Sequence, residues 1–111
     1  MSKYETVGDV LVLSLQGKLN SANSADIEAD ILRNTGQTNR LLLDLSGLDY
    51  ISSAGLRVVL VVAKRLKQSA GLLVLCGIQN QVKEVFEISG FLDILDVVDT
   101  RDQAMRKFPR E

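Results

Sequence analysis

Histidine is absent from this 111-residue sequence, and cysteine occurs only once, as Cys76. Without histidine the chain can have neither Ser-His nor Cys-His catalysis, and no histidine-ligated metal site. A single cysteine also excludes an intramolecular disulfide. Because Cys76 lies in the apolar stretch GLLVLCG, we expect a buried structural thiol and not a reactive one. We therefore predict no metal site.

Tryptophan, a long apolar run and a strong net charge are also missing. Aromatic residues make up 5% of the sequence and hydrophobic residues 46%, which predicts an aliphatic core. The longest purely apolar stretch, 58–63, is far shorter than the ~20 residues of a membrane helix, and MSKYETVGDV lacks the apolar segment of a signal peptide. A net charge of -1 argues against nucleic-acid binding. We expect a cytoplasmic protein that binds neither membranes nor nucleic acids.

Apolar periodicity and turn residues divide the chain into alternating strands and helices. Gly8-Asp9 suits a two-residue hairpin turn of type II′, because glycine accepts the positive φ of its first central position. Apolar runs such as RLLLDL and LLVLC are typical of strands covered on both faces. The predicted strands are 4–7, 10–16, 40–45, 72–76 and 94–99. The first predicted helix begins after residue 20, and the others occupy 53–69, 80–89 and 102–108, the last of which is ended by Pro109. This order predicts an α/β sandwich, with a mainly parallel five-stranded sheet, an N-terminal hairpin and four helices, as a single domain over 1–111.

Two of the predicted helices rest on specific residues. The first helix is expected to be capped by Asn20 and Ser21 or by Asn23 and to stop at 34–36. Its apolar positions are Ala25, Ile27, Ala29, Ile31 and Leu32. The segment 53–69 contains the β-branched run VVLVV, which favours a strand. Its serine start, recurring polar residues and cationic end favour a helix of about four turns instead.

Two adjacent serines, Ser52 and Ser53, precede that helix in the stretch YISSAGL. A serine at this place commonly caps the helix, which contributes about 1 kcal/mol. A catalytic serine would need a G-x-S-x-G elbow, but Ile51 stands where the first glycine should be, and no histidine is present to act as base. A third interpretation is modification, because the free N–H groups and the dipole at a helix start favour an attached phosphate.

No motif in the sequence supports an enzyme or a bound cofactor. GKLNS contains Gly-Lys but lacks the upstream glycine of a phosphate-binding loop. A Ser-Lys pair has no support from residue spacing. We predict no catalytic residues and no cofactor.

The helix after the serines carries a polar stripe formed by Ser53, Arg57, Leu60 or Val61, and Lys64, since these positions share one side at 100° per residue. The opposite side is formed by Leu56, Val59, Ala63 and Leu66, which we expect to pack on the sheet. A mixed apolar and basic stripe beside a modifiable serine is a candidate docking surface. An ordinary solvated helix face is the alternative.

The stretch LLLDLSGLDYISSAGLRVVL closely resembles the central motif of STAS domains, specifically of bacterial anti-sigma factor antagonists. The resemblance extends to VLSLQGKLNSANS, LLVLCGIQNQVKEVFEISGF and ILDVVDT, and so covers nearly the whole chain. It implies a STAS-type sandwich and a binding module instead of an enzyme. In this family a GHKL-type kinase that is also the anti-sigma factor phosphorylates one serine, a PP2C-type phosphatase removes the phosphate, and only the unphosphorylated antagonist captures the kinase and frees the sigma factor.

Carried over to this chain, the resemblance makes Ser53 the phosphoacceptor, with Ser52 as the alternative. The expected partner-binding surface comprises Asn20, Ser21, Ser52, Ser53, Ala54, Gly55, Arg57, Leu60, Val61 and Lys64. Two positions depart from the family pattern: Ser52 and Asn20 stand where an aspartate is common. Losing two nearby carboxylates would reduce repulsion of a phosphate and could change which kinase is recognised.

The sequence is also compared with three alternative functions. A STAS domain can act as a scaffold in another partner-switching or stressosome-like assembly. Direct binding of a nucleotide or small ligand is disfavoured by the missing phosphate-cradling glycine loop. The cytoplasmic domain of an anion transporter is disfavoured because no membrane span accompanies the sequence.

Overall fold

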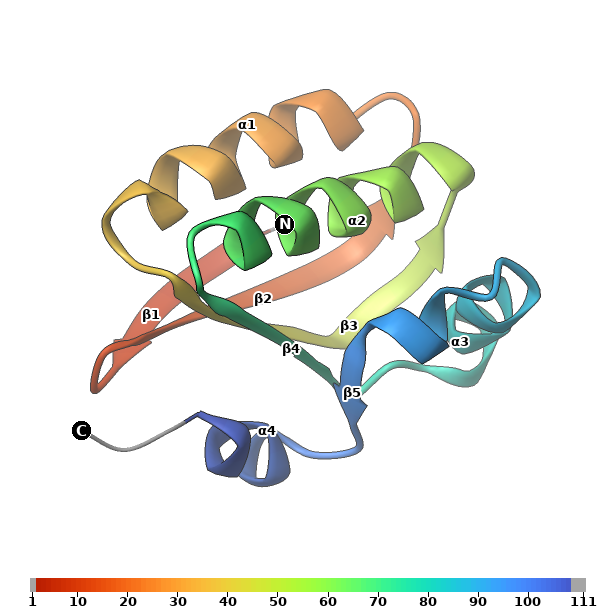
Figure 1. Cartoon of the computed structure of the whole chain (residues 1–111). Helices are drawn as coiled ribbons and strands as arrows, with labels where there is room; N and C mark the ends of the chain where they lie inside the picture. The colour runs from red at the N-terminus through yellow and green to blue at the C-terminus, as the bar shows by residue number, and fades with distance from the viewer. Residues whose placement is uncertain (1, 109–111) are drawn as a thin grey trace.

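The computed structural model describes residues 2–108 and shows a twisted sheet with helices on both faces (Figure 1). The strands are β1 (Ser2–Val7), β2 (Val10–Leu19), β3 (Arg40–Ile51), β4 (Leu72–Cys76) and β5 (Asp96–Val98). The helices are α1 (Ser24–Asn34), α2 (Ser53–Gln68), α3 (Asn80–Ile88) and α4 (Arg101–Lys107), with short 3₁₀ turns η1 (Thr35–Gln37) and η2 (Phe91–Ile94). The predicted order of strands and helices is confirmed.

The five strands form one sheet in the order β1-β2-β3-β4-β5. β1 pairs antiparallel with β2 through a two-residue turn, and β2, β3, β4 and β5 run parallel. Gly8 has φ 63 and Asp9 does not have a positive φ, which fits the predicted type II′ hairpin. The α/β fold with a mainly parallel sheet and an N-terminal hairpin is therefore confirmed.

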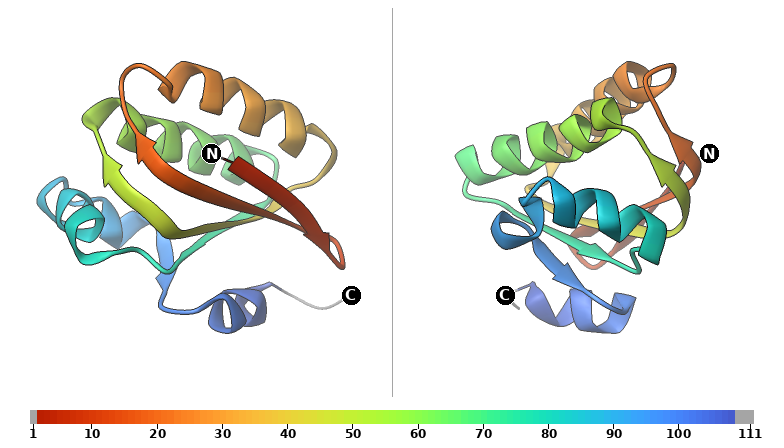
Figure 2. Two further views of the ribbon diagram at one scale, coloured as in Figure 1. Left: turned by 180° about the vertical axis from the view of Figure 1, so that it is seen from behind. Right: turned by 90° about the vertical axis from the view of Figure 1, so that its right-hand side faces the viewer.

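The central strand β3 is covered on both faces of the sheet. Leu41, Leu43 and Leu45 are at most 1% exposed and belong to the core beneath α1 and α2. Leu42, on the other face, packs in a second cluster with Ala104 of α4. Figure 2 shows this layering, with α1 and α2 on one side of the sheet and α4 on the other.

Irregularities in the β2–β3 pair bring the ends of both strands to the start of α2. The register shifts between Ser14 and Gln16 and again between Gly17 and Lys18, where Gly17 has φ 84. Bulges of this kind bend a strand and increase its twist. Beyond them Leu19 still pairs with Ile51, the last residue before the two serines.

Three local expectations were wrong. Ala25 and Ala29 are exposed, because each lies two residues, or about 200°, from a buried isoleucine of α1 and so faces away from the sheet. The last strand is Asp96–Val98 and not 94–99, since a 3₁₀ turn ends at Ile94, which is 71% exposed. The strands β2 and β3 also extend beyond the predicted ends. Pro109, expected to end α4, lies outside the described residues.

Among residues 2–108, the structure contains no helix whose length and apolar character would let it cross a membrane.

Candidate functional site at the start of helix α2

Ser52 is the N-cap of α2. Its hydroxyl oxygen accepts a hydrogen bond from the Gly55 N–H at 3.1 Å, and its carbonyl oxygen accepts one from the Leu56 N–H at 2.8 Å. Its own N–H donates to the Leu19 carbonyl at 2.9 Å, so the cap is also tied to the end of β2. The predicted cap is thus confirmed, and the serine that performs it is Ser52.

Ser53 is the first residue of α2, and its side chain is exposed. Within residues 2–108 its hydroxyl makes no hydrogen bond, and the N–H groups of Ser53 and Ala54 have no backbone partner outside the helix. Free N–H groups of this kind are the donors that anions use at helix starts. The two serines therefore differ in availability, because Ser52 is committed to the cap and Ser53 is not.

Gly55 holds the start of α2 close to the end of the sheet. A Cβ on Gly55 would stand 2.7 Å from both the Cγ and the carbonyl oxygen of Leu19, and 2.9 Å from a side-chain carbon of Ile51. Any larger residue would push the helix away from these strands. Gly55 is buried, so it contributes to the predicted partner surface indirectly, by letting α2 pack closely against the ends of the strands.

The loop between β2 and α1 lies next to this helix start and is fixed by two asparagines. The Asn20 side-chain oxygen accepts from the N–H groups of Ala22 and Asn23 at 2.9 and 3.2 Å. In return the Asn23 side chain accepts from the Asn20 N–H at 2.9 Å and donates to the Lys18 carbonyl at 2.7 Å. Asn23 occupies the cap position of α1 but makes no side-chain cap bond. These bonds leave Ser21 exposed at the tip of an ordered loop.

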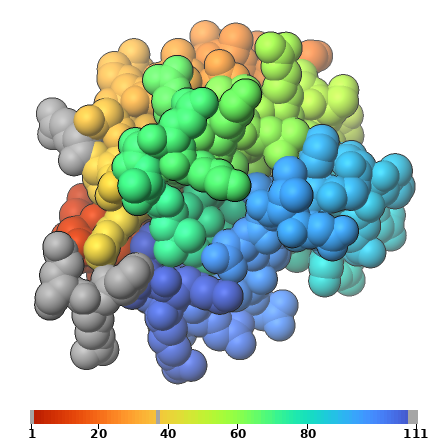
Figure 3. All heavy atoms as spheres, viewed as in Figure 1, coloured from red at the N-terminus to blue at the C-terminus, as the bar shows by residue number. Residues whose placement is uncertain are grey.

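The predicted polar stripe of α2 is on the surface. Ser53, Arg57 and Lys64 are exposed, while Leu60 and Val61 are half-buried beside them. Among the described residues, neither Arg57 nor Lys64 makes an ion pair. Figure 3 shows that the outer side of α2, coloured yellow-green to green, is open to solvent on this face. The expected packing side is buried at Leu56, Val59 and Leu66, and half-buried at Ala63.

Two residues beside the serines were not anticipated from the sequence. Lys18 and Tyr50 pair across β2 and β3, one position before Leu19 and Ile51, and both side chains are exposed. Tyr50 is 49% exposed, which is unusual for an aromatic residue in a sheet and typical of binding surfaces. The signal in the sequence was a tyrosine near the end of a long apolar strand, but the face on which it lies depends on the register shifts between β2 and β3.

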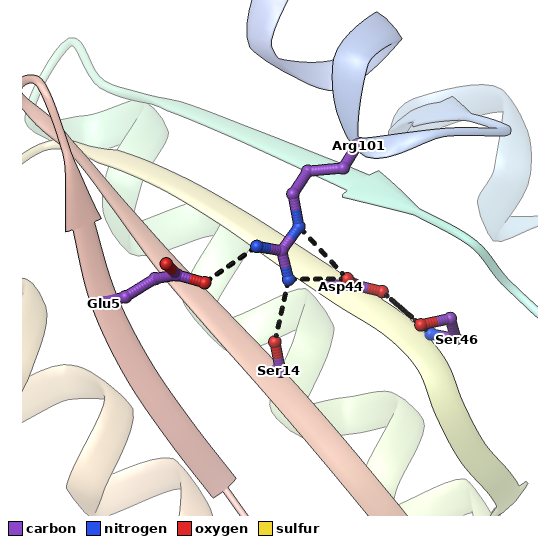
Figure 4. Close-up of polar contacts among 5 residues, drawn as sticks. All are labelled: Glu5, Ser14, Asp44, Ser46 and Arg101. Atoms are coloured by element: carbon purple, nitrogen blue, oxygen red, sulfur yellow. Dashed lines mark hydrogen bonds and ion pairs between the residues drawn. The ribbon is translucent and has the colours of Figure 1, made fainter.

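A second polar cluster lies on the opposite face of the sheet, where Arg101 joins α4 to three strands (Figure 4). Its guanidinium donates to Asp44 at 2.8 and 3.3 Å, to Glu5 at 2.7 Å and to Ser14 at 3.1 Å. Ser46 donates to Asp44 as well, through its hydroxyl at 2.7 Å and its N–H at 3.0 Å. The arrangement pairs both carboxylates with Arg101 and fastens α4 to the sheet.

Ionisation in this cluster follows from the hydrogen bonds. Burial raises the pKa of Asp44, but the bonds from Arg101 and Ser46 outweigh burial and hold that pKa below its usual value. The bonds to Asp44 and Glu5 raise the pKa of Arg101 in turn. Both groups are therefore charged at neutral pH.

Cys76 is 1% exposed at the end of β4. Burial, with a smaller contribution from the nearby negative charge of Asp44, raises the pKa of its thiol to about 11. The predicted burial of this thiol is confirmed, and a protonated, buried thiol is a poor nucleophile.

The fold and the site define a class of protein: a small α/β module that displays an uncommitted serine at a helix start beside an exposed basic stripe. Comparison with known families makes this specific. The chain matches the STAS domain family over residues 2–104 and therefore belongs to it.

The relatives carry related names. The chain is 50% identical over 105 residues to BtrV of Bordetella bronchiseptica, which is provisionally named an anti-sigma factor antagonist, covering 94% of this chain and 90% of that protein. It is 26% identical over 98 residues to the anti-sigma F factor antagonist of Paenibacillus polymyxa, covering 86% and 84%. The crystal structure of a provisionally named anti-sigma factor antagonist of Thermotoga maritima superposes with a TM-score of 0.92 at 27% identity, covering 98% and 95%.

Proposed function

We propose that this chain is an anti-sigma factor antagonist, a cytoplasmic regulator and not an enzyme, made of a single STAS domain over residues 1–111. When unphosphorylated it binds an anti-sigma factor that is also a GHKL-type serine kinase, and so releases the sigma factor. Phosphorylation by that kinase prevents the binding, and a PP2C-type phosphatase restores it. The observation that carries the proposal is the Ser53 hydroxyl at the start of α2, which is exposed and has no hydrogen bond to any residue in 2–108.

Ser53 is the phosphoacceptor in this proposal, and Ser52 supports it. The Ser52 hydroxyl is half-buried and bonded to Gly55, so a kinase would have to break the cap to reach it. The Ser53 hydroxyl is reached without any rearrangement. A phosphate there adds about -1.5 to -2 charges next to free helix N–H groups, which stabilise an anion and leave the fold intact.

The same phosphate changes the electrostatics of the partner surface. Arg57 lies four residues after Ser53, the spacing at which side chains on a helix are neighbours. A phosphoserine would pair with the Arg57 guanidinium and convert a cationic stripe into a neutral or negative one. A partner that uses acidic or apolar groups to bind Arg57, Leu60 and Lys64 would then be repelled.

Asn20 and Ser52 make this surface less acidic while keeping the hydrogen bonds that hold its backbone in place. Both serine and aspartate are good N-caps, so Ser52 keeps the capping hydrogen bond while removing a negative charge. Asn20 uses its side-chain oxygen within its own loop. We infer that the kinase partner of this chain recognises a less acidic site than is common in the family.

Binding to a purified GHKL-type serine kinase tests the proposal. We expect tight binding of the wild type and of Ser53→Ala, and at least tenfold weaker binding of Ser53→Asp, because the added charge imitates part of a phosphate. The matched control is Gln68→Glu, which adds one negative charge at the other end of α2, about 22 Å away. If Ser53→Asp and Gln68→Glu bind equally well, the switch assignment is wrong.

A scaffold role in another partner-switching assembly is the second candidate, since the same exposed surface would serve it. The two functions differ in the fate of the kinase complex. An antagonist competes with a sigma factor for the kinase, whereas a scaffold forms a larger complex without displacing anything. A displacement assay with the labelled sigma factor separates them.

A further inference from the structure

Among residues 2–108, no strand pairs with the outer edge of β1. β1 has β2 as its only neighbouring strand in the described part of the chain, and its residues Ser2, Lys3, Glu5 and Thr6 are exposed. Seen from behind, in the left view of Figure 2, the strand lies at the front with no helix across it. It contains no proline and pairs with β2 without a bulge, so it lacks two of the devices that keep edge strands from pairing.

The hairpin determines which backbone groups face outward. Val7 and Val10 close the two-residue turn and form a hydrogen-bonded pair. Because such pairs alternate with non-bonded ones, Lys3, Glu5 and Val7 direct their N–H and C=O groups toward β2. Ser2, Tyr4 and Thr6 direct theirs away from the sheet, where the described residues offer no strand to receive them.

Only one register lets two copies of this edge pair antiparallel with complementary charges. In an antiparallel pair, the residue numbers of every two facing residues add to the same value. The outward backbone groups belong to the even-numbered residues Ser2, Tyr4 and Thr6, so they face one another only when this sum is even. With a sum of 6, Lys3 would face Lys3, and with a sum of 10, Glu5 would face Glu5. With a sum of 8, Tyr4 faces Tyr4, Ser2 faces Thr6, and Lys3 faces Glu5 of the second copy.

We propose that β1 associates with β1 of a second copy of this chain in that register, forming a continuous sheet across a twofold axis. Three bonded pairs, two Ser2–Thr6 and one Tyr4–Tyr4, supply about six backbone hydrogen bonds. The two Lys3–Glu5 pairs fall at the non-bonded positions, where facing side chains are closest. A C2 interface of this kind uses the same patch on both subunits.

The side chains on both faces of β1 are arranged for this contact. Arg101 binds Oε1 of Glu5 at 2.7 Å and so holds the carboxylate in place, while Lys3 makes no ion pair within residues 2–108. On the other face the Tyr4 hydroxyl donates to Asp30 at 2.8 Å, which fixes the ring that would lie opposite its symmetry mate. The interface is small, so association is weak and reversible, with a dissociation constant of roughly 0.1–1 mM.

Sedimentation equilibrium of the full chain, from ~10 µM to ~2 mM, tests the proposal across that range of affinity. We expect the apparent mass to rise from 12.2 kDa toward twice that value. Thr6→Pro should abolish the rise, because it removes an outward donor while leaving the bonds to β2 intact, as prolines in edge strands do. Thr6→Val is the matched control and should dimerise like the wild type. Unfolding curves of both variants establish that the fold is retained.

Two further measurements locate the interface. Lys3→Glu should weaken dimerisation at least tenfold, because it places two carboxylates at each Lys3–Glu5 position. Amide exchange at high concentration should slow at Tyr4 and Thr6. A mass that stays at 12.2 kDa at ~2 mM overturns the proposal, as does dimerisation of Thr6→Pro equal to that of wild type, or new amide protection confined to other strands.

Discussion

The two serines at the start of α2 should respond differently to removal of their hydroxyls. In Ser52→Ala the Gly55 N–H loses its 3.1 Å hydrogen bond, and the first turn of the helix loses its cap. Loss of an N-cap of this type costs about 1 kcal/mol, within a range of about 0.5–2. In Ser53→Ala no hydrogen bond is lost, and alanine is a better helix former than serine, so the free energy of unfolding should change by less than about 0.5 kcal/mol.

Urea and thermal unfolding measure the difference. A cost of about 1 kcal/mol corresponds to a fall in Tm of roughly 4–6 °C at this chain length. Ser52→Asp is the matched control, because its carboxylate can accept the same hydrogen bond and should recover most of the loss. The reasoning is refuted if Ser53→Ala lowers the stability as much as Ser52→Ala, or if Ser52→Ala has no effect.

Three other perturbations follow from single contacts. Gly55→Ala should lower the free energy of unfolding by about 1–3 kcal/mol, because its Cβ would stand 2.7 Å from the Leu19 carbonyl oxygen. Urea unfolding measures this change, and an unchanged midpoint would contradict the close packing. Asp44→Asn should destabilise the protein at pH 7, and the difference from wild type should shrink below about pH 4. The Asp44 pKa is lowered in the folded state, so the stability it contributes is present above its unfolded pKa and disappears as the pH falls through the folded pKa; a difference that is constant with pH would contradict this. Cys76 should react slowly with a thiol reagent in the native state and rapidly in urea, and fast native labelling would show that it is accessible.

The sequence was most informative where a residue's role is local. The hairpin depends on Gly8, whose positive φ is a property of one residue, and the start of α2 depends on a serine one position before the helix. The prediction for α1 was wrong because it counted every apolar residue as part of the packed side of the helix. Ala25 and Ala29 are apolar, but a helix of 3.6 residues per turn cannot bury both them and Ile27 on one side.

What the sequence could not show depends on distant partners. Arg101 contacts Glu5, which is 96 residues away, and Asp44, which is 57 residues away, and no pattern along the chain links them. The exposure of Tyr50 depends on the two register shifts between β2 and β3. Ser52 and Ser53 differ because the Gly55 N–H donates to the Ser52 hydroxyl. Which serine accepts this bond depends on the exact residue at which α2 begins.

The most direct measurement of the central claim is the site of phosphorylation. The wild type, Ser52→Ala and Ser53→Ala are each incubated with the GHKL-type kinase and ATP, and the modified residue is located by mass spectrometry. We predict one phosphate on Ser53 in the wild type and in Ser52→Ala, and none in Ser53→Ala. A phosphate on Ser52, or on any residue away from the start of α2, would contradict the account.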